Sequence, residues 1–529
     1  MARGLGWELQ AAPPISDALR GMTRLAEGYP ARGKVKRIYV TIPAFDNSYL
    51  RLPERFYARV DPMRPPAPRL IAINRDLACE LGFDPDWLAS REGLDILTGR
   101  LIAEGSEPIA TAYAGHQFGN FVPQLGDGRA ILLGEVVDLN GHRRDIQLKG
   151  AGRTPYSRGG DGRAALGPVL REYLVSEAMA ALHVPTTRSL AASSTGDSVW
   201  RENELPGAVL VRVAASHIRV GTFQFLAARR DLEGIRLLAD HVIARHYPDA
   251  GQAGQPYRAL LEQVVIAQAE LIARWMLVGF IHGVMNTDNM SIAGETIDYG
   301  PCAFLDAYDP ATVFSSIDRH GRYAFGKQPQ IGLWDLTRLA ETLLPLLAED
   351  TDAAIEIAEE VLGLFQPRFV QSYGQGMLAK LGIATMREGD LELTNAILEA
   401  MQRNLVDFTL FFRRLYDAIE PGTGDEPVRE LFVDPTAADA VLDIWRVRLA
   451  REGRSASEIK LGMQAANPVY IPRNHRIEAV IKAAIQGDFA PFEELGAVLS
   501  QPFTARPEFA RYEDPPLDHE RVRATFCGT

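Results

Sequence analysis

Cysteine is scarce in this chain. Its 529 residues include three, Cys79, Cys302 and Cys527, which lie far apart. An odd, widely spaced set argues against the disulfide framework of a secreted domain and against a zinc site built on paired cysteines. The first twenty residues mix charges with prolines and lack the apolar stretch of an export signal. We therefore expect a cytoplasmic protein.

Basic residues are fewer than acidic ones, and long apolar runs are also rare. Lys and Arg number 56 against 68 Asp and Glu, and this net charge of -12 argues against nucleic acid or an anionic membrane surface as a partner. The most apolar segment, Trp275 to Met285, ends long before the roughly 20 residues that a membrane-spanning helix needs. We expect it to be the buried end of a core helix, in a monomer without a membrane partner.

The remaining composition is that of an ordinary folded protein, with 47% hydrophobic residues, 23% charged residues and a mean hydropathy of -0.08. Changes in composition and in the periodicity of apolar residues divide the chain into four parts. We predict an N-terminal extension with proline-rich connectors (1–105), a glycine-rich β region (106–225), a helical region (226–420) and, after the turn-forming stretch 420–426, a C-terminal helical extension (421–529).

The fold class predicted from periodicity is α+β. Strands are expected at 130–139, 144–150 and 207–215, with an Asn-Gly hairpin turn between the first two, and one helix at 167–182. This is a small antiparallel sheet that carries one helix. Helical periodicity dominates after 226, with helices predicted at 257–281, 332–347, 353–364, 391–419, 437–450, 476–485 and 492–499.

Several common enzyme motifs are missing. No Gly-Lys-Ser/Thr follows a glycine loop, so the Walker A pattern is absent. A dinucleotide-binding loop at Gly150 to Gly152 fails because Pro155 and Tyr156 stand where its last glycine and its helix belong. No HExxH, GxSxG or Cys/His cluster indicates a metalloprotease, a serine hydrolase or a zinc enzyme.

Three features of the β region are suited to phosphate. Gly126 and Gly128 lie in a turn before a strand, where backbone amides can approach an anion closely. Lys149 ends the next strand, and Glu172, on the following helix, is placed to hold it. Taken alone, each has an ordinary alternative: a hairpin turn, a surface lysine and a solvated carboxylate.

The helical region adds oxygen ligands. A long apolar helix runs into a polar loop that carries Asn289, and Asp298 follows nine residues later in an Asp-Tyr-Gly sequence. An amide and a carboxylate on adjacent loops suit Mg²⁺, which binds through few carboxylates plus substrate phosphates. The alternative is a capped helix end followed by a turn. Glycine turn, lysine, glutamate, asparagine and aspartate occur in the chain order of a protein kinase.

The position that holds the catalytic base in protein kinases is occupied here by a residue that cannot accept a proton. In the kinase pattern the asparagine follows a histidine by seven, as Asn289 follows His282, and the base stands two after the histidine. That residue is Val284 here, which accepts no proton, so ordinary phosphoryl transfer lacks its base. Asp288 is the nearby candidate.

Five long runs carry a family resemblance. They are YAGHQFGNFVPQLGDGRAILLGE (113–135), QLKGAGRTPYSRGGDGRAALG (147–167), HGVMNTDNM (282–290), TIDYGPCAFLDAYDP (296–310) and NPVYIPRNHRIE (467–478). In these runs the chain resembles the selenoprotein O (SelO, YdiU) family of pseudokinases over nearly its whole length. The resemblance implies a protein-kinase-like bilobal fold, a small β-rich lobe before a large helical lobe, in which ATP lies reversed and AMP passes to a protein hydroxyl.

The resemblance also implies roles for particular residues. Asp288 would accept the proton, Asn289 and Asp298 would hold Mg²⁺ or Mn²⁺, and Glu172 would pair with Lys149. Nucleotide contacts would come from Gly126, Gly128, Arg129, Lys149, Asp161, Gly162, Arg212, Arg219 and Asp298. Residues 121–220 hold 12 Lys and Arg against 10 Asp and Glu, an excess of cations that suits buried β- and γ-phosphates.

Two departures from the family pattern stand out. The helix begins with Gly167-Pro168-Val169 where the family usually has Arg-Ser-Ser. Some bacterial members pair a C-terminal cysteine with one in the activation segment as a redox switch, but 311–318 contains none here. The departure argues against that switch in this chain, in which Cys302 would be only a remote substitute as a partner for Cys527.

The preferred function is transfer of AMP from ATP to Ser, Thr or Tyr hydroxyls of proteins. Two alternatives stay open. One is Mn²⁺-dependent uridylyl transfer from UTP, because no residue visibly selects adenine over uracil. The other is a nucleotide-binding scaffold without catalysis, which Val284 at the base position suggests.

Overall fold

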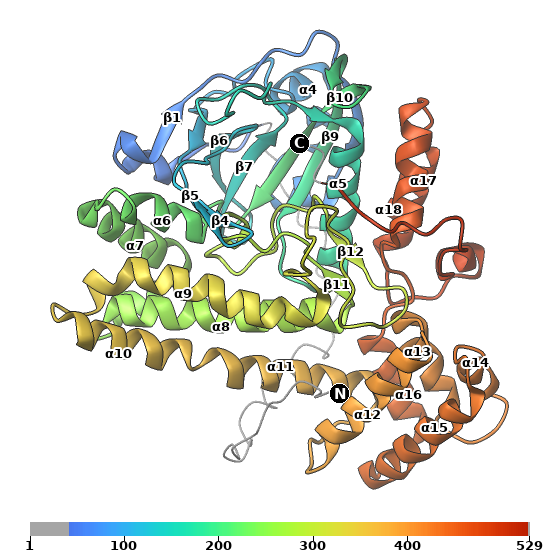
Figure 1. Cartoon of the computed structure of the whole chain (residues 1–529). Helices are drawn as coiled ribbons and strands as arrows, with labels where there is room; N and C mark the ends of the chain where they lie inside the picture. The colour runs from blue at the N-terminus through green and yellow to red at the C-terminus, as the bar shows by residue number, and fades with distance from the viewer. Residues whose placement is uncertain (1–41, 527–529) are drawn as a thin grey trace, which may run out of the picture.

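The computed structural model describes residues 42–526 (Figure 1). Its strands gather in one region and its long helices in another, so the predicted α+β class is confirmed. Cys527 lies outside the described residues, and so does the question of whether it pairs with Cys302. Within 42–526, no helix combines the length and apolarity needed to cross a membrane.

One antiparallel sheet of eight strands forms the β region. Its order is β1 (Tyr57–Arg59), β3 (Ile109–Thr111), β6 (Ala130–Val137), β7 (Arg143–Lys149), β10 (Glu204–Ala214), β9 (Arg188–Trp200) and β2 (Arg69–Ile73), with β8 (Ala164–Ala165) pairing to β10. The predicted hairpin between β6 and β7 is present, and Gly141 in its turn has a φ of 87°. A separate small hairpin consists of β4 (Gly115–Gln117) and β5 (Asn120–Val122).

Five of the eight strands were not predicted, namely β1, β2, β3, β8 and β9. β9 was missed because its buried positions are filled by small or polar side chains such as Ala191 and Ser193, which give no apolar alternation. β1 and β2 come from the segment predicted as an N-terminal extension, and they form the two ends of the sheet. The described part of that segment therefore supplies two strands of the sheet.

The two faces of the sheet pack against different helices. One face is covered by α2 (Arg75–Glu80), α3 (Pro85–Leu88) and α4 (Arg91–Leu97), whose leucines form a core with alternate residues of the central strands, including Ile146, Leu148 and Val211. The other face carries α5 (Leu166–Ala181), the helix predicted at 167–182. Because side chains alternate along a strand, Lys149 and Arg212 fall on the α5 face.

The second region is helical, as predicted. It contains α6 (Val220–Ala227), α7 (Leu232–His246), α8 (Pro256–Leu277), α9 (Gln328–Leu347), α10 (Thr351–Leu362), α11 (Phe365–Lys380), α12 (Asp390–Arg403) and α13 (Phe408–Leu415). α8 lies at its centre, between α9 and α11 (Figure 1). The segment predicted as the buried end of a core helix leaves α8 at Leu277 and continues into a two-residue strand, β11 (Phe280–Ile281), paired with β12 (Ala303–Phe304).

One predicted helix is wrong. The stretch 391–419 is divided into α12 and α13, because the chain turns at Leu405, which has a φ of 54°. Asp407 then caps a new helix by accepting a hydrogen bond from the backbone N–H of Leu410 at 2.8 Å. An apolar pattern that continues through the break hid this restart.

The last part of the chain returns to the β region. It contains α14 (Glu426–Arg429), α15 (Pro435–Leu449), α16 (Ala456–Ala466), α17 (Asn474–Ile485) and α18 (Ala490–Leu499). α17 and α18 pack against α5 (Figure 1). Arg171 on α5 binds Glu478 on α17, with Nη2 and Oε1 2.5 Å apart. The C-terminal helices thereby support the helix that carries Glu172.

Candidate active site

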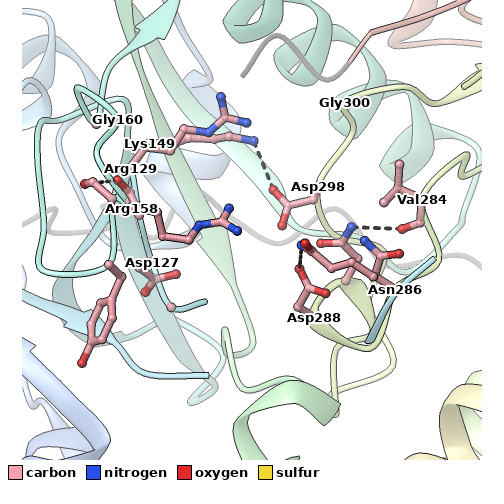
Figure 2. Close-up of a pocket in the computed structure, with 18 of the residues that line it drawn as sticks. Asp127, Arg129, Lys149, Arg158, Gly160, Val284, Asn286, Asp288, Asp298 and Gly300 are labelled. Carbon is pink, nitrogen blue, oxygen red and sulfur yellow. Dashed lines mark hydrogen bonds and ion pairs between the residues drawn. The ribbon is translucent and has the colours of Figure 1, made fainter. Parts of the chain in front are cut away.

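A cavity of about 690 Å³ opens between the sheet and the loops that follow α8. Figure 2 shows its two sides, with Arg129, Lys149 and Arg158 on the side of the sheet and Asp288 and Asp298 on the side of the loops. Most of the residues predicted from the sequence line this cavity, namely Gly126, Gly128, Arg129, Lys149, Asp161, Gly162, Arg212, Arg219, Asp288, Asn289 and Asp298.

The glycine turn before β6 is closely packed. Gly126 has a φ of 81°, and a Cβ there would lie 2.4 Å from the ring of Tyr156. Only glycine fits that conformation and that space without strain. Asp127 between the two glycines is buried and accepts hydrogen bonds from the backbone N–H and the hydroxyl of Thr111, at 3.0 and 2.6 Å. The turn is therefore held rigidly, with its backbone facing the cavity.

Lys149 lies between two carboxylates. Its Nζ is 2.5 Å from Oε2 of Glu172, the neighbour expected from the sequence, and 3.1 Å from Oδ1 of Asp298. Burial and the neighbouring Arg212 lower the pKa of Lys149, against the opposing effect of the two carboxylates. The lysine therefore joins the sheet, α5 and the loop after α8 at one point.

Two arginines complete this cluster. Arg212 from β10 binds Oε1 of Glu172 through Nε at 2.5 Å and also pairs with Asp298. Arg219, at the start of α6, binds Oδ2 of Asp298 at 2.9 Å. Burial by itself would raise the pKa of Asp298, but Arg212, Lys149 and Arg219 hold it well below its ordinary value. Arg219 also lies 3.8 Å from a carboxylate oxygen of buried Asp127. Three buried cations therefore meet at the inner end of the cavity, where their remaining donors can bind phosphate.

Asp288 lies beside this cluster in a short 3₁₀ turn, Thr287–Asn289. Its Oδ2 accepts a hydrogen bond from Nε2 of Gln117 at 3.2 Å, and its backbone carbonyl accepts one from Arg219 at 2.7 Å. Burial raises the pKa of Asp288 to about 6, although Arg219 and the bond from Gln117 act to lower it. A carboxylate of this kind is ionised at neutral pH and still basic enough to accept a proton in a reaction.

Asn289 and Asp298 supply donor atoms suited to a divalent metal. Nδ2 of Asn289 donates to the carbonyl of Val284 at 3.0 Å, which leaves its amide oxygen as the atom able to face the cavity. One amide oxygen and one carboxylate fit Mg²⁺ or Mn²⁺, whose remaining ligands are waters and substrate phosphates. Within residues 42–526, no group of three or more His, Cys, Asp or Glu side chains offers a metal site made of protein alone.

The loop between β7 and β8 forms the outer rim. Asp161 is tied to Arg201, with Oδ2 and Nη1 2.9 Å apart, and it also accepts the backbone N–H of Arg163. Gly162 has a φ of 69°, and its carbonyl accepts the N–H of Gly152 at 3.0 Å. These contacts fix the shape of the loop while both residues line the cavity.

Sequence reasoning missed several residues at this site. Asp127 was given no role because the turn was interpreted through its two glycines, and Arg158 because no motif singles it out. Gln117 and Asn286 also line the cavity. The signal for Gln117 was present, since the run 113–135 contains a His-Gln-Phe-Gly-Asn sequence to which no role was given.

Comparison with known proteins identifies the family. A model of the family described as "Protein adenylyltransferase SelO" matches residues 41–500. The chain belongs to the SelO family. It is similar to proteins named "Protein nucleotidyltransferase YdiU", among them one from Rhodopseudomonas palustris (strain BisB18), 64% identical over 486 residues, and one from Methylorubrum populi, 63% identical over 493 residues. Each alignment covers 92% of this chain and 99% of the relative.

The SelO-family assignment confirms the resemblance inferred from the five motif runs. It also shows that the chain is a nucleotidyltransferase, which sets aside the alternative of a scaffold without catalysis. The cluster around Asp298 is consistent with that activity, because a nucleotidyltransferase must bind a triphosphate and release pyrophosphate.

Proposed function

We propose that this nucleotidyltransferase transfers AMP from ATP to Ser, Thr or Tyr hydroxyls of proteins. The proposal includes a kinase-like bilobal fold, with the β-rich lobe at 106–225, the helical lobe at 226–420, and extensions at 1–105 and 421–529. ATP would lie with its α-phosphate toward the acceptor hydroxyl and its β- and γ-phosphates inside the protein.

The observation that supports this orientation is the burial of the cations. The side chains of Arg212 and Arg219 are 2% and 3% exposed, and that of Lys149 is 9% exposed. A γ-phosphate that leaves with an acceptor has no need of three buried cations beyond the metal ligands. A pyrophosphate held inside the protein does need them, because charge-assisted hydrogen bonds must replace its hydration.

The residues of the site divide the work of the reaction. Asp288 would take the proton of the acceptor hydroxyl as its oxygen bonds to the α-phosphorus, while the bond from that phosphorus to the bridging oxygen breaks. Lys149, Arg212 and Arg219 would hold the departing pyrophosphate. Asn289 and Asp298 would hold Mg²⁺ or Mn²⁺, which supplies charge neutralisation at the phosphates. The backbone of Gly126 and Gly128, with Arg129, Asp161 and Gly162, would shape the nucleotide seat.

Labelling distinguishes this proposal from ordinary phosphoryl transfer. The purified chain is incubated with Mg²⁺ or Mn²⁺, casein as a hydroxyl-rich acceptor, and ATP labelled at either the α- or the γ-phosphate. We expect label in protein from α-labelled ATP alone, and a mass increase of one AMP on modified peptides. Label from γ-labelled ATP alone would overturn the proposal and restore a kinase orientation.

Transfer of UMP is the second candidate. The relatives are named for nucleotidyl transfer in general, whereas the family description specifies adenylyl transfer. Competition between α-labelled ATP and α-labelled UTP at equal concentrations, with Mg²⁺ and then Mn²⁺, decides between them. We expect AMP to predominate, and a majority of UMP adducts would contradict that expectation.

A further inference from the structure

The small hairpin β4–β5 lies directly against the loop that carries Asp288. It belongs to neither the eight-stranded sheet nor the helical core. Three consecutive residues of the hairpin donate to three consecutive residues of the loop. These bonds are His116 N to Thr287 Oγ1 (2.7 Å), Gln117 Nε2 to Asp288 Oδ2 (3.2 Å) and Phe118 N to Asn286 Oδ1 (3.1 Å).

Further contacts hold the hairpin and the loop together. Gln224 on α6 connects them, since its Oε1 accepts from the Thr287 hydroxyl at 2.6 Å and its Nε2 lies 2.8 Å from Nδ1 of His116. Tyr323 donates its hydroxyl to Asn286 at 2.6 Å. The loop is therefore fixed through backbone and side-chain bonds that do not depend on Gln117.

The contact leaves no spare room at the carboxylate. A Cβ on Gly115 would lie 2.5 Å from Oδ1 and 2.9 Å from Cβ of Asp288. Oδ1 is buried and has no hydrogen-bond partner among the described residues. Within 42–526, the bond from Gln117 is thus the one side-chain hydrogen bond that sets the direction of this carboxylate.

We propose that Gln117 is a positioning residue, which holds the Asp288 carboxylate in the orientation needed for proton transfer. The proposal rests on the proposed role of Asp288 as the proton acceptor. An amide suits this task because it donates a hydrogen bond without adding charge. A catalytic base oriented by a third group is a general arrangement in enzymes that activate a hydroxyl.

A competing role can be separated by experiment. Gln117 also lines the cavity, so its amide could instead bind the acceptor protein. A positioning residue changes the rate of the chemical step and acts only through Asp288. A residue that binds the acceptor changes the KM for the acceptor and acts independently of Asp288.

The test compares Gln117→Met, which keeps the length of the side chain and removes its donor, with the wild-type chain. Transfer of α-phosphate label to casein is measured with ATP and with UTP, and the better substrate of the wild type is used. We expect kcat to fall by about 10- to 100-fold, since small displacements of a reacting group cost this much. The KM for casein, the Kd for nucleotide and the Tm should stay within about twofold or 2 °C of wild type.

A double-mutant cycle with Asp288→Asn supplies the decisive readout. Groups that act as a unit are not additive, so Gln117→Met should slow Asp288→Asn by less than about twofold. Asn120→Ala is the matched control, because it removes an exposed amide from the same hairpin and should leave the rate unchanged. Gly115→Ala, which pushes the carboxylate from its other side, should reproduce the fall in kcat.

Three results would overturn the inference: a normal kcat for Gln117→Met, a rise confined to the KM for casein, or full additivity with Asp288→Asn. The position of the transferred label reports separately on the proposed function. If γ-label is transferred, AMP transfer is wrong. The ratio of variant to wild-type rates still tests Gln117.

Discussion

Lys380 provides a quantitative test of how this fold treats an isolated buried charge. It ends α11, and its residue is 3% exposed. Its Nζ lies 4.5 Å from the ring centroid of Phe412 and 5.3 Å from that of Phe408. Burial lowers the pKa of the Lys380 ammonium group to about 7, and no other group contributes to the shift.

The sign of the effect follows from proton binding. A lysine in the unfolded chain titrates near pH 10.4, so between about pH 7 and pH 10.4 the unfolded state binds a proton that the folded state does not. The free energy of unfolding therefore rises as the pH increases through this window, and it falls again as the pH decreases. At about 1.4 kcal/mol per pKa unit, Lys380 lowers stability by about 4 kcal/mol at pH 7 and about 2 kcal/mol at pH 9.

Lys380→Met removes this titration and keeps the shape of the side chain. We expect the variant to be more stable than wild type by about those amounts, in urea unfolding followed by intrinsic fluorescence at pH 7, 8 and 9. Lys482→Met on α17 is the matched control, because Lys482 is exposed and its replacement should change stability by less than about 0.5 kcal/mol. A variant that is less stable than wild type at pH 7, or a difference that does not vary with pH, would refute the reasoning.

Three further predictions concern the active site. Asp298→Ala should abolish label transfer. It should also raise the affinity for metal-free tripolyphosphate by about tenfold, because Lys149, Arg212 and Arg219 lose the carboxylate that competes with phosphate. Calorimetry in EDTA measures this affinity. Glu172→Ala should lower the free energy of unfolding by roughly 3–5 kcal/mol, because it leaves buried cations without their partner, and thermal unfolding measures the loss. Gly126→Ala should weaken nucleotide binding by about tenfold or more in the same calorimeter, because its φ of 81° and the ring of Tyr156 exclude a side chain.

One control variant and two contradicting outcomes accompany these three predictions. Gly141→Ala carries a similar φ of 87°, but no atom lies within 4 Å of the added Cβ, so nucleotide affinity should stay at the wild-type value. Weaker binding of tripolyphosphate to Asp298→Ala would show that the carboxylate organises the cations rather than competing for them. An unchanged Tm for Glu172→Ala would mean that Asp298 alone compensates Lys149 and Arg212.

The sequence was most informative where chemistry and local pattern coincide. The turn at Gly126, the lysine at the end of β7 and the glutamate on α5 were each located by periodicity or motif, and the structure brings them together through the alternation of strand side chains. Prediction failed where contacts join distant segments. The short strands β1 and β2 carry no local signal, because their partners lie far away in the chain. β9 is different: it pairs with the next strand, β10, and it was not predicted because its small and polar residues give no apolar alternation.

The same limit applies to the residues around Asp288. Nothing in the sequence near Gln117 shows that its amide reaches a carboxylate 171 positions later. The break between α12 and α13 escaped notice for a different reason, since neither glycine nor proline marks it and Leu405 adopts a positive φ instead.

The order of strands in the sheet has a consequence for synthesis of the chain. β1 and β2 emerge from the ribosome before the other strands of this sheet, yet they occupy its two ends, and Arg69 of β2 pairs with Ser194 of β9. At about 5–20 residues per second, β2 waits roughly 6–25 s for its partner. During that interval the backbone N–H and C=O groups of β2 are unpaired and can form hydrogen bonds with incorrect strands. We therefore expect chaperones to bind the nascent chain mainly at β1 and β2.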